Sequence, residues 1–125
     1  MKRIMISDGN SDTLFCYRNF FSEEESKMID FVASPIMAIK MIEKNEYIYV
    51  ISDIYFQCDK RGGAGIFETA KKRGVKNRII LTALSNYIDP EQLFATRLVR
   101  KPIYTKKFRN LLPDLISGSN IKYER

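Results

Sequence analysis

Short apolar runs that alternate with stretches of helical periodicity are the feature that most limits how this chain can fold. The runs cover residues 2–7, 27–33, 47–52, 77–83 and 97–100. Between them, apolar residues recur near the spacing of a helix face. This alternation predicts an α/β domain with a five-stranded, mostly parallel sheet. Right-handed crossovers would place helices on both faces of that sheet.

Capping residues and glycines predict where the helices begin and end. Caps are expected at Asn10 or Ser11, at Ser34 ahead of Pro35, at Asp89 ahead of a short helix over 90–96, and at Thr105. We expect residues 58–65 to form a glycine-rich loop and residues 65–73 a helix that Gly74 ends. Pro113 should kink or end the last helix. The second helix should bury its isoleucines, Ile36, Ile39 and Ile42.

The length of the chain fits one domain. With 125 residues, we expect a domain over residues 1–116 and a polar tail over residues 117–125. No apolar run reaches the roughly 18 residues that a membrane span needs, and the start turns polar too early for a signal peptide. Cys16 and Cys58 lack metal spacing and indicate free thiols. These observations predict a cytoplasmic protein that does not bind membranes.

The charged residues narrow the chemistry further. The chain has no histidine, which excludes histidine-dependent triads, metal sites and acid–base catalysis on this chain. A formal net charge of +6 favours acidic partners or anionic surfaces. The basic runs at 71–78 and 104–109 come with no nucleic-acid recognition motif. We interpret them as solvated helix ends, so a nucleic-acid partner is not expected.

The stretch "YIYVISDIYF", residues 47–56, places the carboxylate of Asp53 amid apolar side chains. Burying a carboxylate without a partner is costly. The cost falls if Asp53 stands at the end of a strand, where Lys101 can supply a counter-charge after the fifth run and Asp8 lies nearby after the first. Asp53 is therefore expected at the carboxyl edge of the sheet, which is where parallel sheets bind their ligands.

Two carboxylates, a hydroxyl and an ammonium group are predicted to meet at that edge. They belong to Asp8, Asp53, Thr82 and Lys101. The mixture suits phosphoryl transfer to a carboxylate, because the hydroxyl and the ammonium can contact the incoming phosphoryl oxygens. Carboxylates are also suitable ligands for a hard divalent metal. Taken one at a time, the two aspartates are also typical of turns and helix caps, Thr82 of an ordinary strand and Lys101 of a lysine on the protein surface.

The segments "RIMISDGN", "VISDIYF", "RIILTA" and "LVRKPI" together resemble the receiver domain of two-component response regulators, over about residues 2–116. The resemblance implies a flavodoxin-like fold of five strand–helix units, as in chemotaxis-type single receivers. It also implies phosphorelay signalling, with a histidine kinase or a phosphotransfer protein as the donor. Such a domain is not an enzyme beyond its own phosphotransfer and dephosphorylation.

Each strand-end residue takes a role from this resemblance. Asp53 becomes the phosphoacceptor, and Thr82 and Lys101 become the groups that contact the phosphoryl oxygens. Mg²⁺ would be bound by Asp8, Asp53 and the backbone carbonyl of Tyr55. The bond between Lys101 and Pro102 would be cis, and Leu98 would occupy the switch position on the fifth strand.

The chain departs from the family pattern at several positions. Gly9 stands where a second acidic residue is usual, which weakens the Mg²⁺ site unless Asn10 or Asp12 substitutes. Leu98 stands where an aromatic residue is usual, and the loop after Asp53 lacks the usual proline. The segment 84–100 is shorter than usual, so the fourth helix should be short or irregular.

Two readings of function follow. In the first, phosphorylation of Asp53 switches a protein-binding face formed by the fourth helix, the fifth strand and the fifth helix. Lys106, Lys107 and Arg109 would make that face basic and its partner acidic. In the alternative, the chain is a phosphorylation-independent pseudo-receiver that acts as a docking or dimerisation module, for example as a homodimer. Gly9 and Leu98 favour the alternative.

Overall fold

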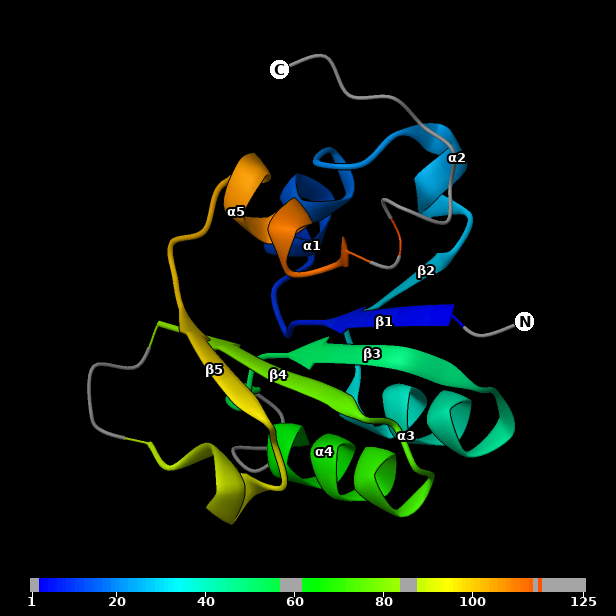
Figure 1. The fold of residues 1–125 in the computed structure, drawn as a ribbon, viewed down its shortest axis with the longest axis vertical. Coiled ribbons are helices and arrows are strands. Elements are labelled where there is room, and N and C mark those ends of the chain that lie inside the picture. Colours follow the sequence, from blue (N-terminus) through cyan, green and yellow to red (C-terminus); the bar gives the residue numbers. More distant parts are fainter. Residues whose placement is uncertain (1–2, 57–61, 84–87, 114, 116–125) are drawn as a thin grey trace.

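The computed structural model describes residues 3–56, 62–83, 88–113 and 115. The predicted tail at 117–125, Cys58 and the loop residues 58–61 lie outside these ranges. The described residues form a five-stranded parallel sheet with helices on both of its faces, which confirms the predicted fold class (Figure 1). No helix within these ranges is long and apolar enough to cross a membrane.

The elements follow one another in the predicted alternation. The strands are Arg3–Ser7 (β1), Ile29–Val32 (β2), Tyr47–Ser52 (β3), Asn77–Thr82 (β4) and Arg97–Arg100 (β5). The α-helices are Ser11–Arg18 (α1), Glu23–Ser26 (α2), Pro35–Lys44 (α3), Gly62–Lys72 (α4) and Thr105–Asn110 (α5), with a 3₁₀ turn at Pro90–Leu93 (η1). The strand order is β2-β1-β3-β4-β5. It changes direction between β1 and β3, so their carboxyl ends flank the crevice where such sheets bind ligands.

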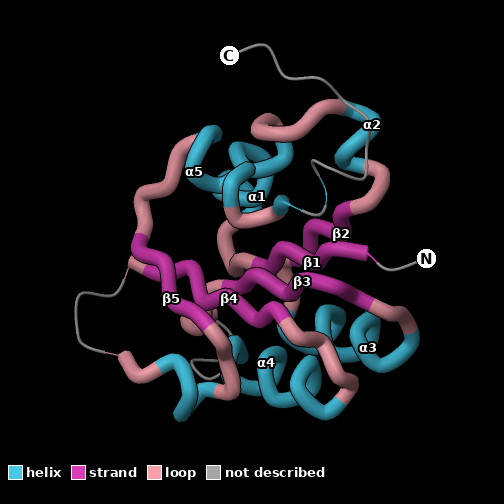
Figure 2. The backbone as a smooth tube through the Cα atoms, in the orientation of Figure 1, coloured by secondary structure: helices cyan, strands magenta, loops and turns pink. Residues whose placement is uncertain are grey.

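The sheet is buried on both faces, which is why its central strands read as continuous apolar runs. Alternate residues of β1 enter different layers of the core. Ile4 and Ile6 pack toward α1 and α5, whereas Met5 packs toward α3 and α4. Figure 2 shows the same division, with α1 and α5 on one side of the strands and α3 and α4 on the other. Because apolar side chains cover both faces, polar groups of the strands can gather at the carboxyl edge of the sheet.

Helix α2 was not predicted, although its start carries a capping box. The Ser22 hydroxyl accepts a hydrogen bond from the Glu25 N–H, and the Glu25 carboxylate accepts one from the Ser22 N–H. The same carboxylate is fully buried and forms a two-pronged ion pair with Arg109 of α5, at 2.7 and 2.8 Å. The prediction that Arg109 belongs to an exposed basic face is therefore wrong, because its guanidinium is turned inward.

Two predictions about α3 and α4 are also wrong. Helix α4 begins at Gly62, so the expected loop over 58–65 ends earlier and its described glycines are helical. Of the isoleucines expected to be buried, Ile42 is buried and Ile39 is partly buried, but Ile36 is 68% exposed. The predicted cap at Ser34 is confirmed, as is the stop at Gly74, whose φ of 83° is a left-handed conformation that suits glycine.

The helix before β5 is short and irregular, as the sequence predicts, whereas the start of α5 differs from the prediction. The expected helix over 90–96 is reduced to η1, which Asp89 caps as predicted. It ends at Leu93, and the φ of 63° at the next residue, Phe94, is unusual for a residue with a bulky side chain. Thr105 does not cap α5, since the cap position is Tyr104 and its side chain makes no capping bond. Helix α5 ends at Asn110, ahead of Pro113.

Candidate functional site

The backbone brings the predicted site residues to one edge of the sheet. The Asp53 N–H donates to the carbonyl of Ser7 at 3.1 Å, which places Asp53 beside the end of β1 and next to Asp8. The Lys101 N–H donates to the carbonyl of Thr82 at 2.8 Å, which aligns the end of β5 with the end of β4. These bonds continue the parallel ladders, so the convergence follows from the strand order.

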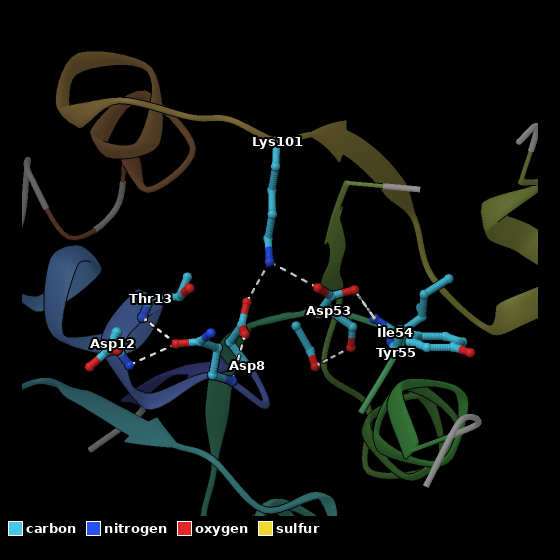
Figure 3. Close-up of polar contacts among 9 residues, drawn as sticks. Asp8, Asp12, Thr13, Asp53, Ile54, Tyr55 and Lys101 are labelled. Atoms are coloured by element: carbon cyan, nitrogen blue, oxygen red, sulfur yellow. Dashed lines mark hydrogen bonds and ion pairs between the residues drawn. The ribbon is translucent and has the colours of Figure 1, made fainter. Parts of the chain in front are cut away.

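Lys101 joins the two carboxylates. Its Nζ lies 2.6 Å from Oδ2 of Asp8 and 2.8 Å from Oδ2 of Asp53, as Figure 3 shows. Burial alone would lower the pKa of the Lys101 ammonium, but the hydrogen bonds to Asp53 and Asp8 outweigh it and raise the pKa above its ordinary value. The lysine therefore remains charged at neutral pH and compensates both carboxylates, as the sequence predicts for Asp53.

The Asp53 carboxylate is fixed on its other side by the backbone. Its Oδ1 accepts hydrogen bonds from the N–H groups of Ile54 at 2.7 Å and Tyr55 at 3.3 Å. Gly63, in the first turn of α4, approaches this loop so closely that a Cβ there would overlap Cα of Ile54 and the carbonyl oxygen of Asp53. Two contacts therefore fix the loop after β3: the hydrogen bonds to the Asp53 carboxylate and the close packing of the start of α4.

A cavity of about 410 Å³ opens above these groups. Its walls include the predicted residues Asp8, Asp53, Thr82 and Lys101. Gly9, Asn10, Thr13, Tyr55 and Ala83 complete the lining. The Thr82 side chain is buried, and the Tyr55 side chain is half exposed at the rim. Polar groups of both charges therefore line a space large enough for a small anionic group.

The peptide bond that follows β5 has the geometry that the resemblance implies. The peptide bond between Lys101 and Pro102 is cis. Leu98 is half buried and packs against the core layer of α3 and α4. It lies beside Ile80 of β4, which enters the same layer two residues before Thr82. The threonine and the leucine therefore belong to the same face of the sheet.

The donor set fits a divalent cation only in part. Asp8 and Asp53 supply two carboxylates beside the cavity, and Tyr55 lies at its rim. Gly9 lines the cavity without offering a ligand. The Asn10 side chain is not free to act as the missing ligand, because its Oδ1 accepts hydrogen bonds from the N–H groups of Asp12 and Thr13 at the start of α1. The described residues contain no cluster of three or more His, Cys, Asp or Glu side chains that could hold a metal.

Two residues near the site were not predicted. Thr13 of α1 lines the cavity, and Tyr17, one turn later, is buried beneath it. Burial raises the pKa of the Tyr17 hydroxyl to about 12; the charge of Lys101 opposes this shift and those of Asp8 and Asp53 add to it. These residues face the site because of how α1 is rotated about its axis relative to the sheet. The spacing of apolar residues alone does not determine that rotation.

The fold has close counterparts among solved structures. No protein-family model matches the sequence, and no curated protein matches it either. A two-component response regulator from Clostridium difficile superposes with a TM-score of 0.73 at 17% identity, covering 97% of this chain and 100% of the other. A CheY-like receiver domain protein from Methanospirillum hungatei superposes with a TM-score of 0.73 at 19% identity, covering 95% of this chain and 96% of the other.

A third structure was determined with a bound metal. The response regulator TrrA from Thermotoga maritima, in complex with Mg²⁺ and BeF, superposes with a TM-score of 0.72 at 25% identity. The match covers 92% of this chain and 99% of that one. In all three comparisons the aligned region includes nearly the whole chain. The chain therefore has the receiver fold of response regulators.

Proposed function

We propose that this chain is a receiver in two-component phosphorelay signalling and that Asp53 accepts its phosphoryl group. The observation that carries the proposal is the position of the Lys101 ammonium, within 2.8 Å of both Asp8 and Asp53. A lysine in that position can neutralise the phosphoryl oxygens that arrive at Asp53. A histidine kinase or a phosphotransfer protein would be the donor in a cell, and a downstream protein or output domain the receiver of the signal.

The transfer itself is a substitution at phosphorus. Oδ1 of Asp53 accepts two backbone N–H groups, whereas Oδ2 accepts a hydrogen bond from the Lys101 ammonium. Oδ2 would form the new O–P bond while the bond from phosphorus to the donor's leaving group breaks. Lys101 would then pair with the transferred group, and the Thr82 hydroxyl would donate to one of its oxygens. Mg²⁺, held by Asp8, Asp53 and the Tyr55 carbonyl, would neutralise charge on the phosphoryl oxygens.

Intact-mass spectrometry with acetyl phosphate and Mg²⁺ tests this proposal. We expect the wild-type chain to gain one phosphoryl mass and Asp53→Asn to gain none. Glu43→Gln is the matched control, because Glu43 is an exposed carboxylate on α3 that does not line the cavity, and it should leave the gain intact. A wild-type chain that gains no phosphoryl mass at any Mg²⁺ concentration rules out the phosphoacceptor role.

Gly9 and Leu98 favour the second candidate, a pseudo-receiver that docks or dimerises without phosphorylation. Gly9 leaves the cation site one carboxylate short, and Leu98 offers no hydroxyl or ring at the switch position. The two candidates differ in one measurable property. A pseudo-receiver would bind its partner, or a second copy, equally well with and without acetyl phosphate and Mg²⁺.

A further inference from the structure

The strand β2 forms an edge of the sheet whose outer side has no described partner. The Ile4 N–H donates to the carbonyl of Met28, and the Asp8 N–H donates to that of Val32. Backbone groups alternate in direction along a strand, so those of Ile29, Phe31 and Ala33 point away from β1. Among the described residues, none donates to or accepts from them.

The opposite edge is protected in a way that β2 is not. Strand β5 carries Arg97 and Arg100, both exposed, and charged side chains on an edge strand discourage pairing with another strand. The only charged residue of β2 is Asp30. Its carboxylate is already engaged by Arg3 at 2.9 and 3.0 Å and by the Tyr47 hydroxyl at 2.7 Å. Strand β2 therefore presents a backbone edge without a repelling charge.

A groove of about 460 Å³ runs along this edge and contains apolar side chains. Every residue of β2 lines it, together with Met37 and Met41 of α3 and Arg18 of α1. Methionines adapt to partners of different shape, and Met37 is 52% exposed. The groove thus combines backbone groups that no described residue pairs with and apolar contacts on the α3 side.

Arg18 gives the other side of the groove a positive charge. Its guanidinium lies over the ring of Phe31, 5.9 Å from the ring centre. Within the described ranges no carboxylate lies within ion-pair distance of it. A strand added beside β2 would alternate its side chains between the two faces, one toward Arg18 and the next toward Met37 and Met41.

We propose that the outer edge of β2 binds an extended peptide segment of a partner protein in which acidic and apolar residues alternate, as a sixth strand of the sheet. Acidic side chains would pair with Arg18, and apolar ones would cover the methionines. A second copy fits less well. Two β2 strands paired about a two-fold axis perpendicular to the sheet would bring both Arg18 side chains to the same face, where they would repel each other. The surface lies at the edge opposite β5 and does not depend on phosphorylation of Asp53.

The test is an amide NMR titration of the full ¹⁵N-labelled chain with a blocked peptide that alternates valine and glutamate. We expect shifts and slower hydrogen exchange at the outward amides of Ile29, Phe31 and Ala33. A peptide with lysine in place of glutamate should bind at least about fivefold more weakly. A glutamate peptide that is N-methylated at every residue cannot donate backbone hydrogen bonds and should not bind.

Charge reversal provides the matched variants. Arg18→Glu should weaken binding of the glutamate peptide by about fivefold and strengthen binding of the lysine peptide. Lys106→Glu, a comparable charge reversal at an exposed position of α5, should change the affinity for neither peptide. Equal binding of the two peptides, or binding of the methylated one, would overturn the proposal. So would protection of the same amides without peptide that rises with protein concentration, because the edge would then belong to a second copy.

Discussion

At the scale of single residues, Gly9 decides how much negative charge the site offers to a cation. A Cβ at position 9 would lie 3.1 Å from Cδ2 of Phe56, so an aspartate fits if that ring moves by a few tenths of an ångström. Its carboxylate would join those of Asp8 and Asp53. We predict that Gly9→Asp tightens Mg²⁺ binding by about tenfold, since ligand charge sets the affinity of such sites. Isothermal titration calorimetry measures this directly.

Gly9→Asn separates charge from shape in that experiment. Asparagine places the same atoms against Phe56 but adds no charge. It should therefore reproduce any loss of stability in the aspartate variant without its gain in Mg²⁺ affinity. Equal gains in both variants, or tight Mg²⁺ binding by the wild type with no gain in either, would contradict the prediction.

The buried hydroxyl of Tyr17 predicts a loss of stability in alkali. Its pKa is raised from 10.0 to about 12, mainly by burial, so between these values the unfolded chain loses a proton that the folded chain keeps. The contribution is complete below pH 10 and is lost as the pH rises through 12. We predict that Tyr17→Phe removes about 1.4 kcal/mol per pH unit from the slope of the unfolding free energy in this window.

Urea denaturation at several values between pH 9 and 11.5 measures that slope. The Tyr17→Phe variant should retain part of the slope, because the pKa values of Tyr47 and Lys101 are raised as well. Tyr104→Phe is the control, since its side chain is 72% exposed. An unchanged slope in Tyr17→Phe would mean that the hydroxyl ionises alike in both states.

The site residues at strand ends could be predicted from the sequence, whereas the site residues on a helix face could not. Asp8, Asp53 and Lys101 meet because parallel strands end at one edge, and the runs that form these strands are visible in the sequence. Thr13 and Tyr17 face the site only because of the rotation of α1 about its axis. That rotation depends on packing against α5, which no local pattern contains.

At the scale of elements, the start of α4 is held against the loop that carries Asp53. A Cβ at Gly63 would overlap backbone atoms of Asp53 and Ile54, which cannot move aside as a side chain can. At Gly65, in the same helix, a Cβ would meet only Cδ1 of Ile39 at 3.4 Å. We predict that Gly63→Ala lowers the unfolding free energy by about 1–3 kcal/mol. Gly65→Ala should instead raise it by up to about 1 kcal/mol.

Chemical denaturation of the two variants provides the comparison, with identical changes two residues apart. The Gly63 variant should also show altered amide shifts at Ile54 and Tyr55, because the helix must withdraw from their loop. Similar stabilities for the two variants would indicate that α4 adjusts freely and does not constrain the loop that carries Asp53.

The elements that were predicted wrongly share one cause. The glycines of α4 suggest a loop, since glycine is a poor helix former, but their small size is required where α4 meets Pro35 and Ile54. Ile36 suggests a buried position, but Pro35, Ala38 and Ile42 already fill the face of α3 that meets the sheet. In both helices, tertiary contacts outweigh local propensity, and those contacts are not visible in a single sequence.

At the scale of the whole molecule, α5 is fixed to α2 and to the segment before it. Arg109 pairs with the buried Glu25 and also donates to the Phe20 carbonyl at 3.0 Å. The Phe108 ring packs edge-on against Tyr17 and Phe21. Breaking such an ion pair would leave a buried charge, so α5 has little freedom to move independently. Of the basic residues on this helix, Lys106 and Lys107 remain exposed for an acidic partner.

The face formed by η1, β5 and α5 should therefore respond little to the state of Asp53. Leu98 lacks the ring and hydroxyl of an aromatic switch residue, so its rotamers should differ little in shape and energy. A ligand shifts a conformational equilibrium only by its different affinity for the two states. We predict that beryllofluoride with Mg²⁺ shifts amides around the cavity and leaves those near Lys106 almost unchanged in two-dimensional NMR. Asp53→Asn, which removes the accepting carboxylate, is the control. Large shifts that spread from Thr82 through Leu98 to α5 would instead show a working switch and would favour the phosphorylated receiver over the pseudo-receiver.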